Sequence, residues 1–382
     1  MPPAEAHGSP AGPLPRLRVG LFGAGLVGQA AHAFSLWDDR SRFEFVAVAD
    51  PSASVRDAVA ARYGVPHACG SLEEALALRL DAVVVAVPDP AHRGAVLTAL
   101  RAGVHVFCEK PLALSLAECD EILAARGDRV VQCGYMKLYD PAVERMVERL
   151  TAGPAELVYL SVEVNDPDQA PFVDHLGLVV GRDVPQGLID ETRRRGREAV
   201  RDALGAEPDA AGARAFEAYL GSLVHDVSLA HHLLRSLGIA LPLPIADAGY
   251  FDGGRGVSLA WTLPGDGRAH LEHLNLPGVA DYRERVTAYC RDRILELTFP
   301  SPYLRHHPTR LVERRSDGTT AGLQTIDYRV SYEEAFRNEL RAFHAAITTG
   351  VPVRATVEAA RDDLAALLDA FRLASNRRQH IA

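Results

Sequence analysis

Between residues 17 and 134, five short apolar runs alternate with amphipathic helical segments, and this alternation constrains the fold more than any other feature. The runs are rich in β-branched residues, and the segments between them carry apolar residues at helical spacing. Near-continuous apolar strands separated by helices form a parallel sheet that is covered on both faces. The predicted strands are Leu17–Phe22, Phe43–Asp50, Asp81–Pro88, His105–Glu109 and Arg129–Gly134.

The first predicted strand leads into a GxGxxG motif, Gly23-Ala24-Gly25-Leu26-Val27-Gly28, which a helical segment follows. In this context Gly23 permits a tight turn, Gly25 lets a pyrophosphate approach the backbone, and Gly28 allows close packing of helix on strand. The helix N-terminus then offers unpaired N–H groups to the phosphates. The motif predicts a doubly wound, Rossmann-type dinucleotide-binding domain, which we place at residues 16–138.

Asp50 ends the second predicted strand, 22 positions after Gly28, near the spacing of about 20 expected for a ribose-binding acid. A carboxylate there accepts hydrogen bonds from the ribose hydroxyls and repels a 2′-phosphate. NAD is therefore favoured over NADP, and Pro51 is expected to line the same site. Arg56 in the following helix keeps NADP as an alternative.

A lysine stands at the end of the predicted strand His105–Glu109, in Glu109-Lys110-Pro111. Ligands of doubly wound sheets bind at the carboxyl ends of the strands. Lys110 is therefore placed to hold a substrate hydroxyl, or to exchange a proton with it, as hydride leaves the same carbon. The alternative is a lysine at a strand end without a chemical role.

Several ordered motifs together resemble the Gfo/Idh/MocA family, which is named after glucose–fructose oxidoreductase, inositol dehydrogenase and a rhizopine-catabolism protein. The resemblance covers essentially the whole chain after residue 15, and the chain looks like a poorly characterised subgroup. It implies an NAD(P)-dependent dehydrogenase or reductase acting on CH–OH groups, assembled as a homodimer or homotetramer. It also implies that Val87, Pro88, His92 and Glu109 contribute to the cofactor site. The segments that carry it are GAGLVG, VAVADP, VAVPDPAH, GVHVFCEKPLALS, CGYMKLYDPAV and GSLVHDVSLAHHLL.

After residue 138 the pattern changes to a helix at about Pro141–Leu150 and a series of closely spaced strands. Their alternating character indicates a large, mostly antiparallel sheet, hence an α+β domain. We assign residues 139–352 to substrate binding and oligomerisation, with a helical insertion at about 166–218. Two amphipathic helices follow, at about 332–348 and 356–375, and residues 353–382 are expected to pack back on the core. The predicted strands are AELVYLSVEV, IADAGYF, GVSLAWTL, AHLEHLNL, YRERVTAYC and RILELTF.

A helix predicted at Tyr219–Leu234 carries His225, which aligns with the catalytic histidine of the family. The resemblance implies that His225 is the acid/base partner of Lys110. Inositol dehydrogenases have an aspartate four residues earlier and another three later, where this chain has Gly221 and Ser228. The chain therefore departs from the family's Asp–Lys–His relay.

Substrate-binding residues are expected around this pair: Lys137, Tyr139, Asp226, Tyr303 and Arg305. Asp226 is not a simple substitute for the missing aspartates, because neighbouring helical residues point about 100° apart.

No metal site is expected from the histidines of this helix, since His225, His231 and His232 do not place two ligands on one helix face. His231 and His232 are expected on a solvated or partly packed helix face.

The insertion contains an arginine-rich stretch, Leu188–Leu204, in which acidic residues are interspersed. The pattern favours a solvated helix of mixed charge. The alternative is a helical lid that presents arginine to a phosphate or carboxylate of the substrate.

Composition limits the partners and the compartment. The net charge of −9 argues against non-specific binding of nucleic acid or anionic membranes. No apolar run approaches the roughly 20 residues of a membrane span. Five scattered cysteines without CxxC spacing favour a reducing, cytoplasmic compartment. Residues 1–15, rich in Pro, Ala and Gly, are expected to form a disordered leader.

These observations predict an NAD-dependent oxidoreductase acting on a small-molecule substrate. Hydride would pass between the nicotinamide and a secondary alcohol or ketone of a sugar, a cyclitol or a related polyhydroxylated molecule. One alternative is a redox-neutral enzyme with tightly bound NAD, which oxidises transiently and then epimerises or eliminates. Another is a non-catalytic ligand sensor on the same fold.

Overall fold

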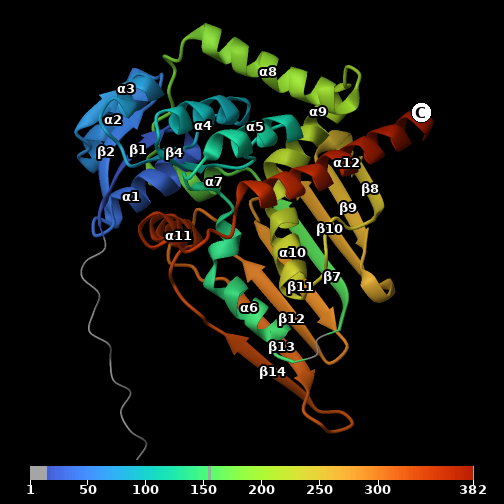
Figure 1. Ribbon diagram of the computed structural model, residues 1–382. Helices are drawn as coiled ribbons and strands as arrows, with labels where there is room; N and C mark the ends of the chain where they lie inside the picture. The colour runs from blue at the N-terminus through green and yellow to red at the C-terminus, as the bar shows by residue number, and fades with distance from the viewer. Residues whose placement is uncertain (1–14, 154–155, 382) are drawn as a thin grey trace, which may run out of the picture.

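The N-terminal domain is built on a six-stranded parallel sheet (Figure 1). The computed structural model describes residues 15–153 and 156–381. The strand order is β3-β2-β1-β4-β5-β6, and every neighbouring pair is parallel. The order reverses between β1 and β4, and at such a point a crevice opens at the carboxyl ends of the strands. The strands are β1 (Leu17–Phe22), β2 (Phe43–Ala49), β3 (His67–Cys69), β4 (Ala82–Val85), β5 (His105–Cys108) and β6 (Val131–Cys133).

Helices cover both faces of this sheet. Helices α3, α4 and α5 share one apolar core with it, and α1 and α2 share a second core on the other face. All four residues of β4 are buried, as expected for a strand between two helical layers. The predicted doubly wound domain is thus confirmed. The helices are α1 (Phe34–Asp38), α2 (Ala53–Tyr63), α3 (Leu72–Leu76), α4 (His92–Arg101) and α5 (Leu116–Arg126).

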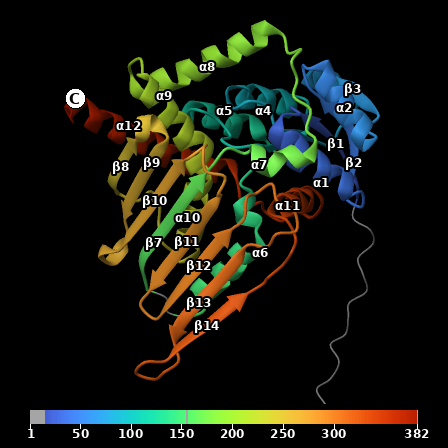
Figure 2. The ribbon, with the colours of Figure 1, turned by 180° about the vertical axis from the view of Figure 1, so that it is seen from behind.

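The second domain is an eight-stranded sheet in the order β14-β13-β12-β11-β7-β10-β9-β8. Only β7 and β10 pair in parallel, so the predicted mostly antiparallel sheet is confirmed. Helices α6 (Pro141–Thr151) and α10 (Val224–Ser236) lie over one face, and Figure 2 shows the opposite face. The strands are β7 (Leu157–Asp166), β8 (Ile245–Phe251), β9 (Gly256–Thr262), β10 (Arg268–Asn275), β11 (Arg283–Cys290), β12 (Arg293–Phe299), β13 (Arg310–Ser316) and β14 (Leu323–Tyr328).

The chain returns to the first domain through α11 (Ala335–Thr349) and α12 (Val357–Ile381). Leu340 and Phe343 of α11 join the core of the parallel sheet, and the ring of Phe343 lies 5.9 Å from that of Phe107. Helix α12 then runs along α5 and α10. The return therefore begins before residue 353, because the apolar face of α11 already covers the parallel sheet.

Some elements differ from the sequence prediction. The strands β3, β13 and β14 were not predicted. The short β3 and the edge strand β14 expose much of their length. The helix predicted at Tyr219–Leu234 is divided, since a π-helical turn, η5 (Ala218–Leu223), precedes α10. Residues 1–14 of the expected leader lie outside the described residues.

The insertion folds into α7 (Ala170–Val173), α8 (Gln186–Leu204) and α9 (Ala210–Glu217). Helix α8 lies at the outer edge of the molecule, beyond α4 and α5 (Figure 1). Val200 and Ala203 are its buried residues, and Arg194 pairs with Glu191 and Glu198 at the surface. The predicted mixed-charge helix therefore agrees with the structure. None of the helices within the described residues has the length and apolar character needed to cross a membrane.

Candidate active site

The glycine loop after β1 is tightly packed on one side and open on the other. Gly23 has a φ of +90°, and a Cβ atom there would lie 2.5 Å from the carbonyl of Ala86. A Cβ atom on Gly28 would lie 2.3 Å from the carbonyl oxygen of Gly23, whereas one on Gly25 would meet nothing within 4 Å. Side chains are thus excluded where helix and strand meet, and the backbone at Gly25 is left accessible, as a bound pyrophosphate requires.

Asp50 lies beside this loop with 9% of its surface exposed. Its Oδ2 accepts the Ala24 N–H at 2.8 Å, and its Oδ1 accepts the Ser52 N–H at 2.9 Å. A carboxylate oxygen has further acceptor capacity. Asp50 therefore shapes the loop and still faces the groove with lone pairs suited to ribose hydroxyls.

A groove of about 990 Å³ runs over the carboxyl ends of the parallel strands. Its outer wall comes from the insertion, including Gly181, Thr192 and Arg193. Ala24 lines a neighbouring cavity of about 510 Å³. The predicted cofactor residues that line the groove are Gly23, Gly25, Leu26, Val27, Asp50, Pro51, Val87, Pro88, His92, Glu109 and Lys110. The open glycine loop, the carboxylate of Asp50 and the long groove together fit a dinucleotide.

At the inner end of the groove, His92 connects the loop that contains Val87 to the segment that contains Pro111. The ring is buried, with Nδ1 2.7 Å from the carbonyl oxygen of Pro111 and Nε2 2.8 Å from that of Val87. An imidazolium would donate to both carbonyls and a neutral ring to one of them. His92 thereby fixes the loop at Val87 relative to the segment that carries Lys110.

Lys110 joins the two domains at the end of the groove. Its Nζ donates to the carbonyl of Gly221, one helical turn before His225. The acceptor that Lys110 finds on this turn is therefore a backbone carbonyl and not a side-chain acid. Position 228 is the other place where the chain lacks an expected aspartate, and there the Ser228 hydroxyl donates to the carbonyl of His225 at 2.9 Å.

The surroundings of His225 favour the neutral form of its ring. Burial, followed by the positive charges of Lys110 and Lys137, lowers its pKa well below the ordinary value of 6.5. Its Nδ1 atom is buried and has no hydrogen-bond partner among the described residues. A buried polar atom of this kind requires a partner, which a substrate hydroxyl would supply.

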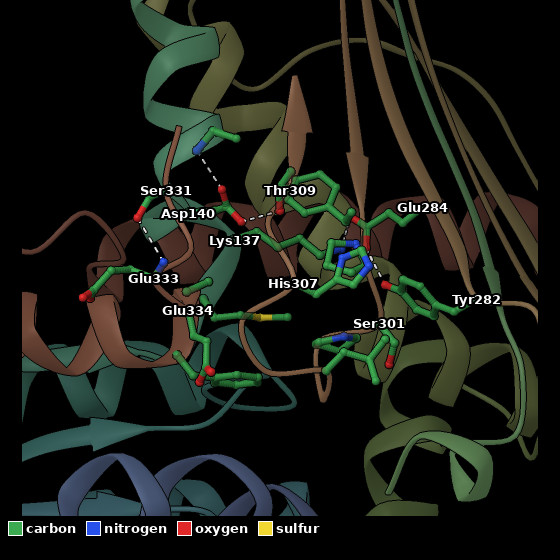
Figure 3. Close-up of a pocket in the computed structure, with 18 residues that line it drawn as sticks. Lys137, Asp140, Tyr282, Glu284, Ser301, His307, Thr309, Ser331, Glu333 and Glu334 are labelled. Atoms are coloured by element: carbon green, nitrogen blue, oxygen red, sulfur yellow. Dashed lines mark hydrogen bonds and ion pairs between the residues drawn. The ribbon is translucent and has the colours of Figure 1, made fainter. Parts of the chain in front are cut away.

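Lys137 lies in a buried ion-pair cluster, not at the rim of the site (Figure 3). Its Nζ is 2.8 Å from Asp226 Oδ1 and 2.7 Å from Glu284 Oε1. Burial alone would lower the pKa of Lys137, but the carboxylates of Asp226 and Glu284 raise it. The Tyr282 hydroxyl donates to the second oxygen of Glu284. Lys110 and Lys137 are the only lysines of the chain, and both lie in this region.

The other predicted substrate residues have different surroundings. The Tyr139 hydroxyl accepts the backbone N–H groups of Arg354 and Ala355, and the residue lines neither the groove nor the neighbouring cavity. Arg305 lies over the Phe34 ring and donates to the carbonyl of Ala30, so it joins the domains. Tyr303 is largely enclosed, and burial, then the charges of Glu109 and Asp166, raises its pKa.

His231 is buried, unlike the solvated or partly packed residue that we expected. Its Nδ1 lies 2.6 Å from Asp363 Oδ1, and its ring stacks on Trp261 at 5.0 Å. The histidine therefore packs α10 against α12 and the sheet.

The sequence analysis missed a buried cluster beneath Glu109, formed with His32 and Glu339. His32 Nε2 lies 2.7 Å from Glu109 Oε1, and neither carboxylate oxygen of Glu339 has a hydrogen-bond partner among the described residues. The ligand-type atoms of the three residues all lie within 4.8 Å of one another. Burial, then the charge of Glu109, raises the pKa of Glu339 well above its usual value. A raised pKa favours the protonated form of Glu339, whereas the lowered pKa of Glu109 favours its ionised form.

Replacing Glu339 with glutamine is expected to stabilise the protein at high pH. The folded state holds a proton that the unfolded chain releases above pH 4.5, so this residue costs stability as the pH rises from there. Each unit of pKa elevation costs about 1.4 kcal/mol, and we expect Glu339→Gln to gain about 1–3 kcal/mol at pH 8 and little at pH 4.5.

Urea denaturation at both pH values measures this gain. Glu217→Gln, at an exposed position, is the matched control and should change little at either pH. If the stability gain of Glu339→Gln does not grow between pH 4.5 and pH 8, the pKa of Glu339 is not raised in the folded protein.

Two buried acids, Glu284 of the Lys137 cluster and Glu339 of the Glu109 cluster, have a signal in the sequence. Glu284 alternates with Val286 and Ala288 on the buried face of β11, and Glu339 precedes Phe343 by one helical turn. A charged residue at an otherwise apolar position of a periodic pattern marks a buried polar site.

Comparisons with known proteins agree with the fold. Residues 17–135 match the model of the Gfo/Idh/MocA oxidoreductase family, described as an NAD-binding Rossmann fold. Inositol 2-dehydrogenase 3 of Saccharopolyspora erythraea is 38% identical over 140 residues, which are 36% of this chain and 41% of that protein. The chain thus matches about two fifths of the length of this curated relative.

Solved structures resemble both domains. UDP-N-acetylglucosamine 3-dehydrogenase from Acidithiobacillus ferrooxidans superimposes with a TM-score of 0.68 at 20% identity, covering 95% of this chain and 99% of that one. A 3-ketoreductase from Actinomadura kijaniata, in complex with NADP, gives a TM-score of 0.67 at 18% identity, covering 93% and 96%. These likenesses show the two-domain fold. Residues 17–135 are thus similar to the NAD-binding domain of the Gfo/Idh/MocA oxidoreductase family.

Proposed function

We propose that this protein is an NAD-dependent oxidoreductase. It transfers hydride between the nicotinamide and a secondary alcohol or ketone of a sugar, a cyclitol or a related polyhydroxylated molecule. The observation that carries the proposal is the contact of Lys110 with the Gly221 carbonyl, which brings the lysine at the end of the cofactor groove to the turn before His225.

Lys110 and His225 both act on the reacting hydroxyl group of the substrate. The bound nicotinamide supplies hydride acceptance or donation. The Lys110 Nζ donates a hydrogen bond to the substrate oxygen, and the neutral His225 accepts the hydroxyl proton at its unpartnered Nδ1. In the reverse direction, protonated His225 returns this proton to the ketone oxygen.

The surroundings of this pair suit a substrate with several hydroxyl groups. Burial, then the charges of Lys137 and Lys110, lowers the pKa of His273 to about 4. His273 and Glu284 both pair with Val164 across neighbouring strands, so they lie in one row on the face that α10 covers. A neutral histidine can accept a hydrogen bond from a hydroxyl or donate one to it, and a carboxylate can accept one. The names of the relatives, inositol and amino-sugar dehydrogenases, support the same class.

The ribose acid favours NAD as the cofactor. Asp50 faces the groove, and Arg56 Nη1 donates to the backbone carbonyls of Asp50 and Pro51. This arginine is thus engaged by the backbone beside the position that a 2′-phosphate would take.

We also propose that the protein is a homodimer or homotetramer that uses the open face of the eight-stranded sheet. Tyr159 and Tyr289 pack on each other on neighbouring strands, with ring centroids 5.7 Å apart, and 39% of Tyr289 is exposed. Sedimentation of the full chain tests this assembly.

Native mass spectrometry followed by a substrate panel tests the function. We expect the purified protein to bind NAD at one site per chain and to form NADH with at least one polyol or cyclitol of the panel. If a substrate is converted without net NADH, the redox-neutral alternative applies. Absence of nucleotide binding would refute the proposal.

A further inference from the structure

The segment 177–184, which we call the strap, lies across the groove before α8 begins. Gln29 fixes one end of it: its Nε2 donates to the carbonyl of Val179, and its Oε1 accepts the Val179 N–H, both at 2.9 Å. Arg62 donates to the carbonyl of Leu176 at 2.9 Å, just before the strap. The strap is therefore attached to the cofactor domain by specific contacts.

Asp183 fixes the other end of the strap at the N-terminus of α2. Its carboxylate accepts the Ser54 N–H at 3.0 Å, the Ser54 hydroxyl at 2.8 Å and the Ser52 hydroxyl. The Ser52 hydroxyl, then the Ser54 groups, lower the pKa of Asp183, so it stays ionised. A carboxylate thus occupies a position that combines a helix N-terminus with two hydroxyl donors, which is a suitable environment for a phosphate.

This position lies directly beside the ribose acid. Ser52 donates its backbone N–H to Asp50, and the strap residues Gly181 and Val184 line both the groove and the neighbouring cavity. A Cβ atom on Gly181 would lie 2.5 Å from Ser52 Oγ, so the strap approaches the loop as closely as only glycine permits. A phosphate on the ribose 2′-oxygen would extend from Asp50 toward Ser52 and Ser54.

We propose that Asp183 determines cofactor choice by latching the strap over the adenosine end of the groove, in the place of a 2′-phosphate. NAD binds beneath the closed strap, whereas NADP must displace Asp183 and open it. The inference rests on the proposed nicotinamide cofactor and adds a second residue, remote from Asp50 in the sequence, to its selection.

Two variants of the full chain test the latch by calorimetric titration with NAD⁺ and NADP⁺. Asp183→Ala removes the competing carboxylate, and Gly181→Val keeps Asp183 but forces the strap away from Ser52. In both, the ratio of the NADP⁺ to the NAD⁺ dissociation constant is expected to fall at least tenfold from the wild-type value. Asp202→Asn, an exposed acid at the far end of α8, is the control and should leave the ratio unchanged.

Each remaining outcome contradicts the latch. A smaller change of the ratio in either variant overturns it. A changed ratio in Asp183→Ala but not in Gly181→Val would mean that Asp183 acts only as a nearby surface charge. Wild-type protein that prefers NADP⁺ refutes the latch and leaves the proposed oxidoreductase standing. Wild-type protein that binds neither nucleotide refutes both proposals.

Discussion

Replacing Lys110 with alanine is expected to lower kcat by a factor of about 10²–10⁴, the usual contribution of a positioned proton-transfer group. The lysine touches the turn before His225 and lines the groove, so it lies where we propose that substrate and nicotinamide meet. Its removal leaves the glycine loop and Asp50 intact. Steady-state kinetics with the best substrate of the panel measures the loss, and calorimetry should show NAD⁺ affinity within about threefold of wild type.

The matched control is Arg101→Ala, which removes an exposed cation at the end of α4, outside the groove. It should retain wild-type kcat. A Lys110→Ala protein that binds NAD⁺ and retains more than a tenth of the wild-type kcat would remove Lys110 from the catalytic assignment.

The second large effect concerns stability. Lys137→Met is expected to cost about 3–5 kcal/mol at pH 8, because it leaves Asp226 and Glu284 buried without their cation. Burial already raises the pKa of both acids, so they become protonated more readily than exposed acids as the pH falls. The cost should therefore shrink between pH 8 and pH 5. Urea denaturation at the two pH values measures it.

A triple variant, Lys137→Met with Asp226→Asn and Glu284→Gln, removes all three charges and should recover most of the lost stability. Arg291→Met is the control, since its ion pair with Glu156 is exposed and screened by solvent, so its loss should change stability little. If Lys137→Met loses no more stability than this control, the buried cluster does not stabilise the protein.

The placement of residues that belong to a local motif was predictable from the sequence. The glycine loop, Asp50 and Lys110 each lie at a strand end, and the order of strands and helices alone brings such ends together. The doubly wound sheet and the mostly antiparallel sheet followed from hydrophobic periodicity in the same way.

Roles that depend on a distant partner were not predictable. Tyr139 looked like a pocket residue next to Lys137, yet its hydroxyl is occupied by backbone groups more than 200 positions later. Asp183 and Ser52 are 131 positions apart, and no periodicity in either segment indicates their contact. Such pairs arise from the docking of the insertion on the first domain, which local propensity does not encode.

The two lysines have a practical consequence for spectroscopy. Reductive methylation with ¹³C-formaldehyde modifies only amines, so in this chain it can label only the α-amino group, Lys110 and Lys137. Lys137 is 7% exposed and paired with two acids, whereas Lys110 faces the groove. The labelled protein would therefore report on the cofactor groove through the methyl resonances of Lys110, without any engineered probe.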